Sequence, residues 1–393
     1  MAAEIFARAR PDYRSAWRSF RARATALGTA LLLFGAAAKG EEIRIEVTRG
    51  RAAASFSGAG ANATQGTQAQ AFTLSERAEH GLSASGAELL LDGARVAQPL
   101  LVRPGASPLL LEGKPLPGRI EVWAEQGALI VVNALDLEEY VSAVVSSEMP
   151  ARWPAAALEA QAIAARTYAV AQKISSGPGA RAHLGASVLD QVYAGAAHPE
   201  SGASAAAKAT YGKVLTWNAA PIAAYFSASC GGKSESAEGA FDVPPGSTPY
   251  LRVEDDGDSD AAMPRAEWMV RIPLATISQT LQRAGRLHAA VTSLAVTETT
   301  SSGRVRKIKL GAAGNKSVAM KGAELRQLLG YSTLPSLAFK VEVEKGDALF
   351  RGRGSGHGVG LCQWGARARA ASGETAEQIL AHYYPGAEIR QMY

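Results

Sequence analysis

The sequence predicts an α+β fold, and three observations support this prediction. Between Glu41 and about residue 135, short apolar runs alternate with polar residues and are separated by Gly, Pro and Ser, which is typical of β-strands. Apolar residues then recur at intervals of three and four in LDLEEYVSAVVSSE, which indicates a helix with one buried face. The 393 residues are 47% hydrophobic and 20% charged, so the chain can bury the core of one large domain or of two ordinary ones.

The first 38 residues are predicted to be a secretory signal peptide. Six arginines precede residue 24 and lead into an apolar stretch from Ala24 to Ala38 that ends in small residues. This stretch is shorter than the roughly 20 apolar residues that span a bilayer. We therefore expect cleavage near Ala38, export to the periplasm or cell wall, and no stable membrane span. An amphipathic terminal helix with a basic arm is the alternative.

The net charge of +5 does not indicate a nucleic-acid partner. The N-terminal arginines, offset by Glu4 and Asp12, contribute +4 of this charge, which leaves about +1 for the rest of the chain. After the signal peptide we expect a β-rich N-terminal region at residues 39–117 and a mixed domain at residues 118–393.

The first helix of the mixed domain is expected to end at an acidic residue. Val141 and Val144 share the apolar face of this helix, and Glu148 lies on the same face. Pro150 disfavours helical geometry at Met149, so the helix should end at about Glu148. A second helix should follow in PAAALEAQAIAARTYAVAQK, whose alanines allow other backbone to approach closely.

Glu148 is the candidate catalytic residue. Its apolar neighbours disfavour the charged carboxylate, and so does the negative end of the helix dipole, so both effects are expected to raise its pKa. A carboxyl group that stays protonated near neutral pH is suited to act as a general acid. The alternative is a solvent-facing glutamate at a frayed helix end.

The later elements of the mixed domain can also be predicted from local patterns. We expect strands in VLTWNAAPIAAYFSASC, a hairpin in LAVTETTSSGRVRKIKL, and two helices after the C-terminal glycine loop. Thr375 and Gln378 have the spacing of a capping box at the start of the last helix. The acidic EDDGDSDAAMP is expected to be a solvated surface loop, with a cation site as the less common alternative.

The two cysteines, Cys230 and Cys362, leave three interpretations open. They could form one disulfide in an exported protein, bind zinc together with His357, or provide a Cys-His nucleophile. No spacing in the sequence demands any of these, and His357 could equally be a loop histidine whose partners are backbone groups. GSGHGVG and SCGGKS both fail the glycine spacing of nucleotide-binding loops.

Four stretches of the chain together resemble the family of stage II sporulation protein D and its amidase-enhancer relatives. The first is NALDLEEYVSAVVSSEMPARWPAAALEAQAIAARTYAVAQK, and the second combines VYAG with YFSASCGGKSES. The third is PYL after a proline-rich turn, and the fourth is GRGSGHGVGLCQWGARARAASGETAEQILAHYYPGAEI. In order along the chain, they span about residues 118 to 390.

The resemblance implies a lytic transglycosylase that acts on bacterial peptidoglycan and prefers glycan strands already stripped of their peptides. It implies that residues 118–393 are the catalytic domain, in which a helical pair carries the catalytic Glu148 at the edge of a substrate groove. The residues that would line this groove are Arg166, Tyr168, Ser229, Cys230, Lys233, His357 and Gln363, with a purely structural role as the alternative for Arg166.

The resemblance also bears on cofactors and partners. Some family members hold zinc through extra Cys and His residues, but no histidine stands beside Cys230 here, so we expect neither metal nor cofactor. The expected partners are glycan strands and a peptidoglycan amidase. One acid suffices for a lytic transglycosylase, although the fold could bring in a second carboxylate from Asp190, Glu235 or Asp242. The alternative function is a non-catalytic wall-binding modulator that stimulates an N-acetylmuramoyl-L-alanine amidase.

Overall fold

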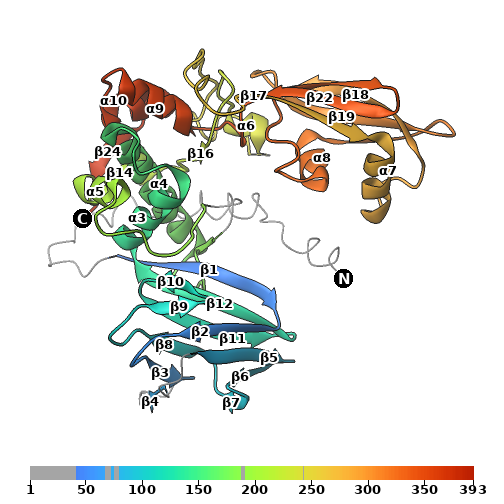
Figure 1. Cartoon of the computed structure of the whole chain (residues 1–393). Helices are drawn as coiled ribbons and strands as arrows, with labels where there is room; N and C mark the ends of the chain where they lie inside the picture. The colour runs from blue at the N-terminus through green and yellow to red at the C-terminus, as the bar shows by residue number, and fades with distance from the viewer. Residues whose placement is uncertain (1–40, 67–71, 75–78, 187–190, 242) are drawn as a thin grey trace. The chain divides into compact units, whose positions relative to one another are not determined.

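The computed structural model describes residues 41–66, 72–74, 79–186, 191–241 and 243–393. The chain divides into two compact units, which are described separately (Figure 1). The first unit consists of residues 41–223 and Ile389–Tyr393, and the second unit is Ala224–Glu388. The predicted signal peptide lies outside the described residues.

The first unit contains two large antiparallel sheets. One sheet has the order β13 (Leu184–Gly185), β1 (Glu42–Arg51), β12 (Ala128–Asp136), β11 (Arg119–Glu125), β8 (Leu100–Arg103), β3 (Asn62–Gln65) and β4 (Phe72–Thr73), with only β13 parallel to its neighbour. The other has the order β10 (Lys114–Leu116), β9 (Leu109–Leu111), β2 (Ala53–Ser57), β5 (His80–Ser85), β6 (Glu88–Leu91) and β7 (Ala94–Val96). The predicted β-rich region and the mixed α and β character of the chain are confirmed.

Strands on the two sides of the boundary expected between residues 117 and 118 pair with one another. β12 pairs with β1 in the register Ile45 to Asn133, and β11 pairs with β8 in the register Val122 to Leu100. Strands from both sides of residue 117 thus form one hydrogen-bonded sheet. The two compact units part at Ala223. The alternating pattern of a strand does not reveal its partner strand, so this pairing could not be predicted.

Helices α3 (Leu137–Glu148), α4 (Ala155–Ser176) and α5 (Gly202–Ala209) pack against one another beside these sheets (Figure 1). A small sheet of β15 (Ala220–Pro221), β14 (Lys213–Trp217) and β24 (Glu388–Gln391) completes this part of the fold. Asp136, the last residue of β12, caps α3 by accepting from the backbone N–H of Glu138 at 2.8 Å. The predicted end of α3 is confirmed, because Met149 is extended.

The second unit is built around short strands and paired helices. β16 (Phe226–Ser227) runs parallel to β23 (Leu361–Cys362), and α6 (Ala237–Ala240), α9 (Gln363–Ala371) and α10 (Ala376–Tyr383) accompany them. The predicted capping box of Thr375 and Gln378 is present at the start of α10.

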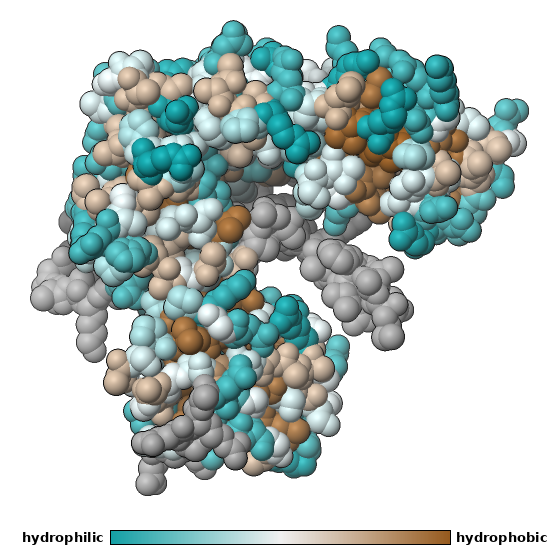
Figure 2. Space-filling model, in the orientation of Figure 1, coloured by the Kyte–Doolittle hydropathy of each residue, from teal (hydrophilic) through white to brown (hydrophobic). Residues whose placement is uncertain are grey.

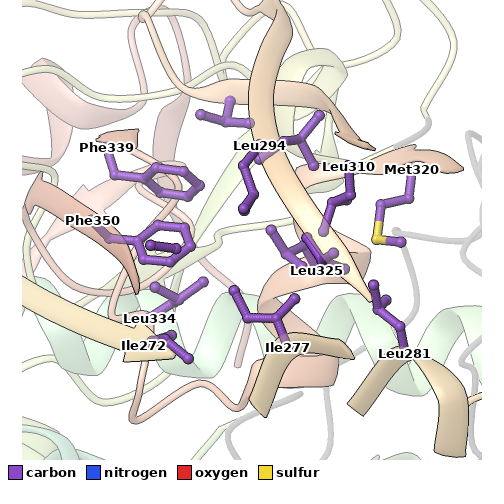
Figure 3. Packing of buried hydrophobic residues seen from close by; sticks show 14 of the residues in the cluster. Ile272, Ile277, Leu281, Leu294, Leu310, Met320, Leu325, Leu334, Phe339 and Phe350 are labelled. Carbon is purple, nitrogen blue, oxygen red and sulfur yellow. The ribbon is translucent and has the colours of Figure 1, made fainter. Parts of the chain in front are cut away.

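Residues 267–353 of the second unit form a layer of strands covered on one face by two helices. One sheet has the order β17 (Glu267–Pro273), β22 (Asp347–Arg353) and β21 (Phe339–Glu344), and the other has the order β18 (Val291–Thr299), β19 (Val305–Ala312) and β20 (Lys316–Lys321). α7 (Leu274–Arg283) contacts β17 and β18, and α8 (Gly322–Leu329) contacts β19 and β20. Both helices pack against the core that the two sheets share. Figure 3 shows this core, in which Ile277 and Leu325 of the helices face Leu310 and Phe350 of the strands. The predicted hairpin is confirmed as β18 and β19.

Among the described residues, no helix combines the length and the apolar content needed to cross a membrane.

Candidate functional site

Glu148 lies where the buried face of α3 reaches the surface of the first unit. Val141 and Val144, which precede it on this face, have no exposed surface, whereas the Glu148 side chain is half-buried. The chain leaves the helix directly after this residue because Met149 is extended. The carboxyl group therefore stands at the border between the apolar core and solvent.

The segment 191–194 holds the carboxyl group of Glu148 in place. The backbone N–H of Val192 donates to Glu148 Oε1 at 2.9 Å. The neighbouring Ala194 N–H donates to Ser147 Oγ at 3.3 Å, so the segment contacts two consecutive side chains at the end of α3. This contact was not predicted, since nothing in the sequence brings these segments together.

Two buried side chains anchor this segment to the rest of the first unit. Gln191 Oε1 accepts from the Tyr140 hydroxyl at 2.7 Å, and Gln191 Nε2 donates to the Ala165 carbonyl at 3.2 Å. The Tyr193 hydroxyl donates to Asn133 Oδ1 at 2.6 Å. These partners belong to α3, α4 and β12, so three elements of the fold fix the N–H group that reaches the candidate acid.

Arg166 lies inside the helical layer and has no exposed surface. Its Nε and Nη2 atoms donate to the two carboxylate oxygens of Glu138 at 2.7 and 2.6 Å. The remaining donors bond the carbonyl of Lys213 at 3.1 Å and that of Ala207 at 3.2 Å. A substrate cannot reach a guanidinium that is fully enclosed, so these contacts support the structural alternative for Arg166.

A cavity of about 320 Å³ opens on the other side of α3. Glu139 and Ser142 of α3 line it together with Lys208 and Tyr211. Glu139 and Glu148 are nine residues apart, which is half a turn around a helix with 3.6 residues per turn. This cavity is therefore separate from the site at Glu148.

Two glycine-rich motifs that are far apart in the sequence meet in the second unit. β16 pairs with β23, so that Phe226 lies opposite Leu361 and Ser227 opposite Cys362. Further along, the backbones of Ser229 and Ser355 exchange two hydrogen bonds of 3.0 Å. The stretches YFSASCGGKSES and GSGHGVGLCQWG therefore form one structural framework.

The residues predicted to line a groove fall into both units and differ in exposure. Tyr168, like Arg166 and Glu148, belongs to the first unit and is buried in α4. The second unit holds the other candidates, of which Ser229, Cys230 and Gln363 are buried, His357 is half-buried and Lys233 is exposed. Their roles as substrate ligands stay predictions.

Cys230 and Cys362 are neighbours, but both are free thiols. The Cys230 N–H donates to Cys362 Sγ at 3.2 Å, and Cys230 Sγ lies 3.4 Å from Asp256 Oδ2. The ligand atoms of these three buried residues lie within 4.8 Å of one another, so this donor set could hold a soft divalent cation. His357 does not belong to it.

The acidic loop EDDGDSDAAMP differs from the solvated surface loop expected, because two of its carboxylates are buried. Asp256 accepts from the Tyr383 hydroxyl at 2.8 Å and from Arg369 at 3.1 Å. Asp260 accepts from the Ser229 hydroxyl and from the Gly231 N–H. Donors from distant segments of the chain make this burial possible, so the local sequence gave no signal of it.

His357 packs edge-on against two aromatic rings that sequence reasoning did not single out. Its ring centroid lies 5.2 Å from that of Phe241 and 6.0 Å from that of Tyr225. Its Nδ1 accepts from the backbone N–H of Val359 at 3.0 Å. Burial, together with the charge of nearby Arg326 and of a second arginine, lowers the pKa of His357 to about 3, so the imidazole is neutral at ordinary pH.

Arg304 is a further residue that sequence reasoning missed. It is 3% exposed, and it donates to the carbonyl of Cys230 at 2.6 Å and to that of Lys233 at 3.0 Å. It thereby supports the loop that carries three of the predicted residues. In the sequence Arg304 stands in a basic hairpin, where an arginine is expected to be exposed. Its burial therefore could not be predicted from the sequence.

Glu235, one of the possible second carboxylates, is engaged in contacts that hold the fold together. It is fully buried, and it accepts from the hydroxyls of Thr300 and of Ser302, the latter at 2.7 Å. It thus fastens the turn between β18 and β19 to the KSES motif. Asp190 and Asp242 lie outside the described residues.

Comparison with known proteins identifies two families along the chain. The family Stage II sporulation protein matches residues 125–217, which run from the end of β11 through α3, α4 and α5 to β14. A domain of unknown function, DUF8618, matches residues 250–360, which include both three-stranded sheets of the second unit.

Three relatives are similar to the chain over about two thirds of its length. Stage II sporulation protein D of Bacillus subtilis is 32% identical over 277 residues, which cover 66% of this chain and 76% of that protein. An uncharacterized protein of Brachyspira hyodysenteriae is 31% identical over 66% of this chain and 68% of its own length. The amidase enhancer of Bacillus subtilis is 27% identical, over 63% of this chain and 39% of its own length. The protein therefore belongs to the family of stage II sporulation protein D and the amidase enhancer.

Proposed function

We propose that this protein is an exported peptidoglycan lytic transglycosylase with Glu148 as its catalytic acid and base. The observation that carries the proposal is the position of the Glu148 carboxyl group, which is half-buried at the end of α3 and bonded to Val192 N–H at 2.9 Å. A carboxyl group fixed at the border of the core can meet a substrate oxygen with little loss of side-chain freedom.

The substrate is a glycan strand of alternating N-acetylmuramic acid and N-acetylglucosamine, stripped of its peptides. Glu148 donates its proton to the glycosidic oxygen while the bond from that oxygen to the anomeric carbon of muramic acid breaks. The 6-hydroxyl of the same muramic acid attacks the anomeric carbon, and its proton passes to the Glu148 carboxylate. The products are a 1,6-anhydro-muramic acid end and a free hydroxyl, and no water is consumed.

Among the residues that the structure describes, the carboxylates considered as a second acid each have another partner or position, which supports this reaction over ordinary hydrolysis. Hydrolysis needs a second carboxylate to activate water or to attack the sugar. On α3 the neighbouring Glu138 is committed to Arg166, and Glu139 lies half a turn away around the helix. Glu235 is bound to hydroxyl groups inside the second unit. An attacking hydroxyl supplied by the substrate removes the need for a second acid.

The test is the release of anhydro-ended fragments from peptide-free glycan strands, analysed by mass spectrometry. Wild-type protein should release them, and Glu148→Gln should reduce the rate by about a thousandfold or more, since the amide has no proton to donate. Glu139→Gln makes the same change on the exposed side of α3 and should retain the rate. Products with ordinary reducing ends, or an active Glu148→Gln protein, would contradict the proposal.

The second candidate function is a non-catalytic modulator that binds the wall and stimulates a separate peptidoglycan amidase. The similarity to the amidase enhancer favours it, although the match covers 39% of that protein. In this case the purified chain should raise the rate of an added N-acetylmuramoyl-L-alanine amidase, and Glu148→Gln should leave the stimulation unchanged. Anhydro ends should then be absent from the products of the chain alone.

A further inference from the structure

Two thiols and two carboxylates lie together inside the second unit. Cys230 Sγ lies 3.4 Å from Asp256 Oδ2 and 3.7 Å from Asp260 Oδ2. Cys362 Sγ lies 3.9 Å from the same oxygen of Asp260. All four residues are buried, and none is more than 6% exposed. We call them the thiol–carboxylate cluster. Each of its side chains is of a kind that binds metal ions.

The distances within the cluster match those between the ligand atoms of a zinc ion. Zinc binds thiolate sulfur at about 2.3 Å and carboxylate oxygen at about 2.0 to 2.2 Å, in tetrahedral geometry. A sulfur and an oxygen bound to one ion are therefore about 3.5 Å apart. The three distances of 3.4, 3.7 and 3.9 Å are close to this value. The ligand atoms of Cys230, Cys362 and Asp256 also lie within 4.8 Å of one another, so one ion can reach all three after small side-chain movements.

Three segments that are far apart in the sequence supply these donors. Cys230 follows β16 in the first glycine motif, and Cys362 is the last residue of β23, which pairs with β16. Asp256 and Asp260 belong to the acidic loop, and the Asp256 N–H donates to the Gly232 carbonyl at 3.0 Å. An ion bound here would fasten the acidic loop to both glycine motifs, as structural zinc ions fasten separate segments of a chain.

Further hydrogen bonds orient both carboxylates. The Tyr383 hydroxyl donates to Asp256 Oδ2 at 2.8 Å, and Arg369 donates to Asp256 Oδ1 at 3.1 Å. The Gly231 N–H donates to Asp260 Oδ2 at 2.6 Å. Carboxylates that bind metal ions are held by outer partners of this kind. The oxygen atoms nearest the sulfurs are thus fixed in place before any ion binds.

The charges in the cluster also favour a cation. A hydrogen bond with Cys362 and burial raise the pKa of the Cys230 thiol, and the charges of Asp256 and Asp260 act in the same direction. The thiol therefore keeps its proton unless a cation takes its place. Zinc binding would release two thiol protons to solvent, and the two charges of the ion would balance the two thiolates. The net charge of the cluster then stays as it is without the ion.

The carboxylates argue against a disulfide between the paired cysteines. A disulfide forms through a thiolate, and buried carboxylates beside the thiols disfavour the thiolate. A disulfide also has no use for oxygen donors at ligand distance from its sulfurs. Magnesium and calcium take oxygen ligands, whereas thiolates select softer ions. Zinc accepts sulfur and carboxylate oxygen together, so it fits this donor set.

The helices beside the cluster shield it from solvent. α9 begins directly after Cys362 and carries Arg369, and α10 carries Tyr383. Figure 2 shows a mixed surface of hydrophilic and weakly apolar residues over these two helices. The four side chains of the cluster are buried behind such elements. A site enclosed by protein is typical of structural zinc rather than catalytic zinc, which keeps an open position.

We propose that the thiol–carboxylate cluster binds one structural zinc ion, with Cys230, Cys362 and Asp256 as ligands and Asp260 in the fourth position. Binding forms two zinc–sulfur and two zinc–oxygen bonds, and the protons of the two thiols leave to solvent. No metal was expected from the sequence, because no histidine stands beside Cys230, but the fold supplies carboxylates from a distant loop instead. Glu148 lies in the first unit, so the ion is assigned no step in the proposed reaction.

The first test is zinc binding by the untagged full chain, kept reduced by a phosphine so that both thiols are free. After zinc is added and the excess removed by gel filtration, elemental mass spectrometry should find one zinc per chain. Cobalt(II) in place of zinc should give a sulfur-to-metal charge-transfer band and the strong visible bands of a tetrahedral ion. Zinc should also raise the melting temperature, since it binds the folded chain more tightly than the unfolded chain. These measurements need no variant.

Variants then assign the ligands. Cys362→Ser and Asp256→Asn should each weaken zinc binding by about a hundredfold or more, because the loss of an outer partner alone costs about 10- to 100-fold. Asp256→Asn keeps an acceptor for the Tyr383 hydroxyl, and it should keep the sulfur-to-cobalt band, whereas Cys362→Ser should reduce it. The matched control is Asp258→Asn, which changes an exposed carboxylate of the same loop and should bind zinc like the wild type.

Three results would overturn the proposal. The first is a reduced wild-type chain that binds no zinc, or whose melting temperature does not respond to it. The second is equal zinc affinity in Cys362→Ser and in the wild type, which would place the ion elsewhere on the chain. The third is a disulfide between the two cysteines in freshly isolated protein whose thiols are trapped by acid, which would assign the pair to a cross-link.

Discussion

Arg166 occupies a binding-motif position in the ARTYA stretch, but its guanidinium faces inward. It makes a bidentate ion pair with Glu138 and donates hydrogen bonds to backbone carbonyl groups of two other segments. The helical pattern of α4 predicted a helix at this position, but it could not show which residues the arginine would meet. A buried arginine with this many partners is suited to position the helices, which supports the structural alternative for Arg166.

Replacing Arg166 by Met is therefore expected to act on stability. The change leaves Glu138 in a largely enclosed position without its cation, which should lower the free energy of unfolding by about 3 to 5 kcal/mol. Denaturant unfolding followed by circular dichroism measures this loss. Arg49→Met, which removes an exposed ion pair with Glu46, should cost less than about 1 kcal/mol. Unchanged stability together with lost activity would instead place Arg166 at the substrate.

His357 gives the protein a dependence of stability on pH. The unfolded chain binds a proton on this residue near pH 6.5, whereas the folded protein does so only near pH 3. Between these values protonation favours the unfolded chain, so stability is full above about pH 6.5 and falls as the pH is lowered. His183, whose pKa burial lowers to about 4, acts in the same direction.

The predicted outcome is a melting temperature that decreases from pH 7 to pH 4, and that decreases less steeply in His357→Gln. Glutamine keeps a hydrogen-bond acceptor near Val359 N–H but cannot titrate. His288→Gln makes the same change at an exposed histidine and is the matched control. An identical slope in His357→Gln would show that this imidazole is protonated equally well in both states.

At the scale of elements, local patterns predicted the helices better than the loops. The spacing of valines and the position of Pro150 predicted where α3 ends, because both act within a few residues. The segment that bonds Glu148 could not be predicted, since Gln191 and Tyr193 reach partners on three other elements. The pairing of YFSASCGGKSES with GSGHGVGLCQWG in the second unit was not predicted for the same reason.

Tyr193→Phe tests whether this segment positions the candidate acid. The change removes the hydroxyl that bonds Asn133 at 2.6 Å and should cost about 1 to 3 kcal/mol of stability. Because the segment is loosened, the amide of Val192 should exchange faster with deuterium, and kcat should fall about tenfold with little change in KM. Tyr211→Phe changes an exposed tyrosine and should alter neither quantity. Faster exchange with an unchanged kcat would separate the segment from catalysis.

At the scale of the whole molecule, composition and periodicity predicted the mixed α and β character of the chain but not which strands pair. The β-rich region merges with β11 and β12 into one sheet, and the compact units part at Ala223. Strand pairing between distant segments decides this division, and a single sequence carries no record of such pairing. The uneven distribution of charge was also not predicted. The net charge beyond the signal peptide is near zero, although residues 267–353 carry a net charge of +8.

The most direct test of the account is digestion of peptide-free glycan strands in water enriched in oxygen-18. If the 6-hydroxyl of muramic acid is the attacking group, the new ends contain no oxygen-18 and are lighter by one water than hydrolysed ends. Glu148→Gln should then release no fragments above background. One oxygen-18 atom for each bond cut, or fragments from Glu148→Gln at the wild-type rate, would contradict the assignment of Glu148 as the single acid and base.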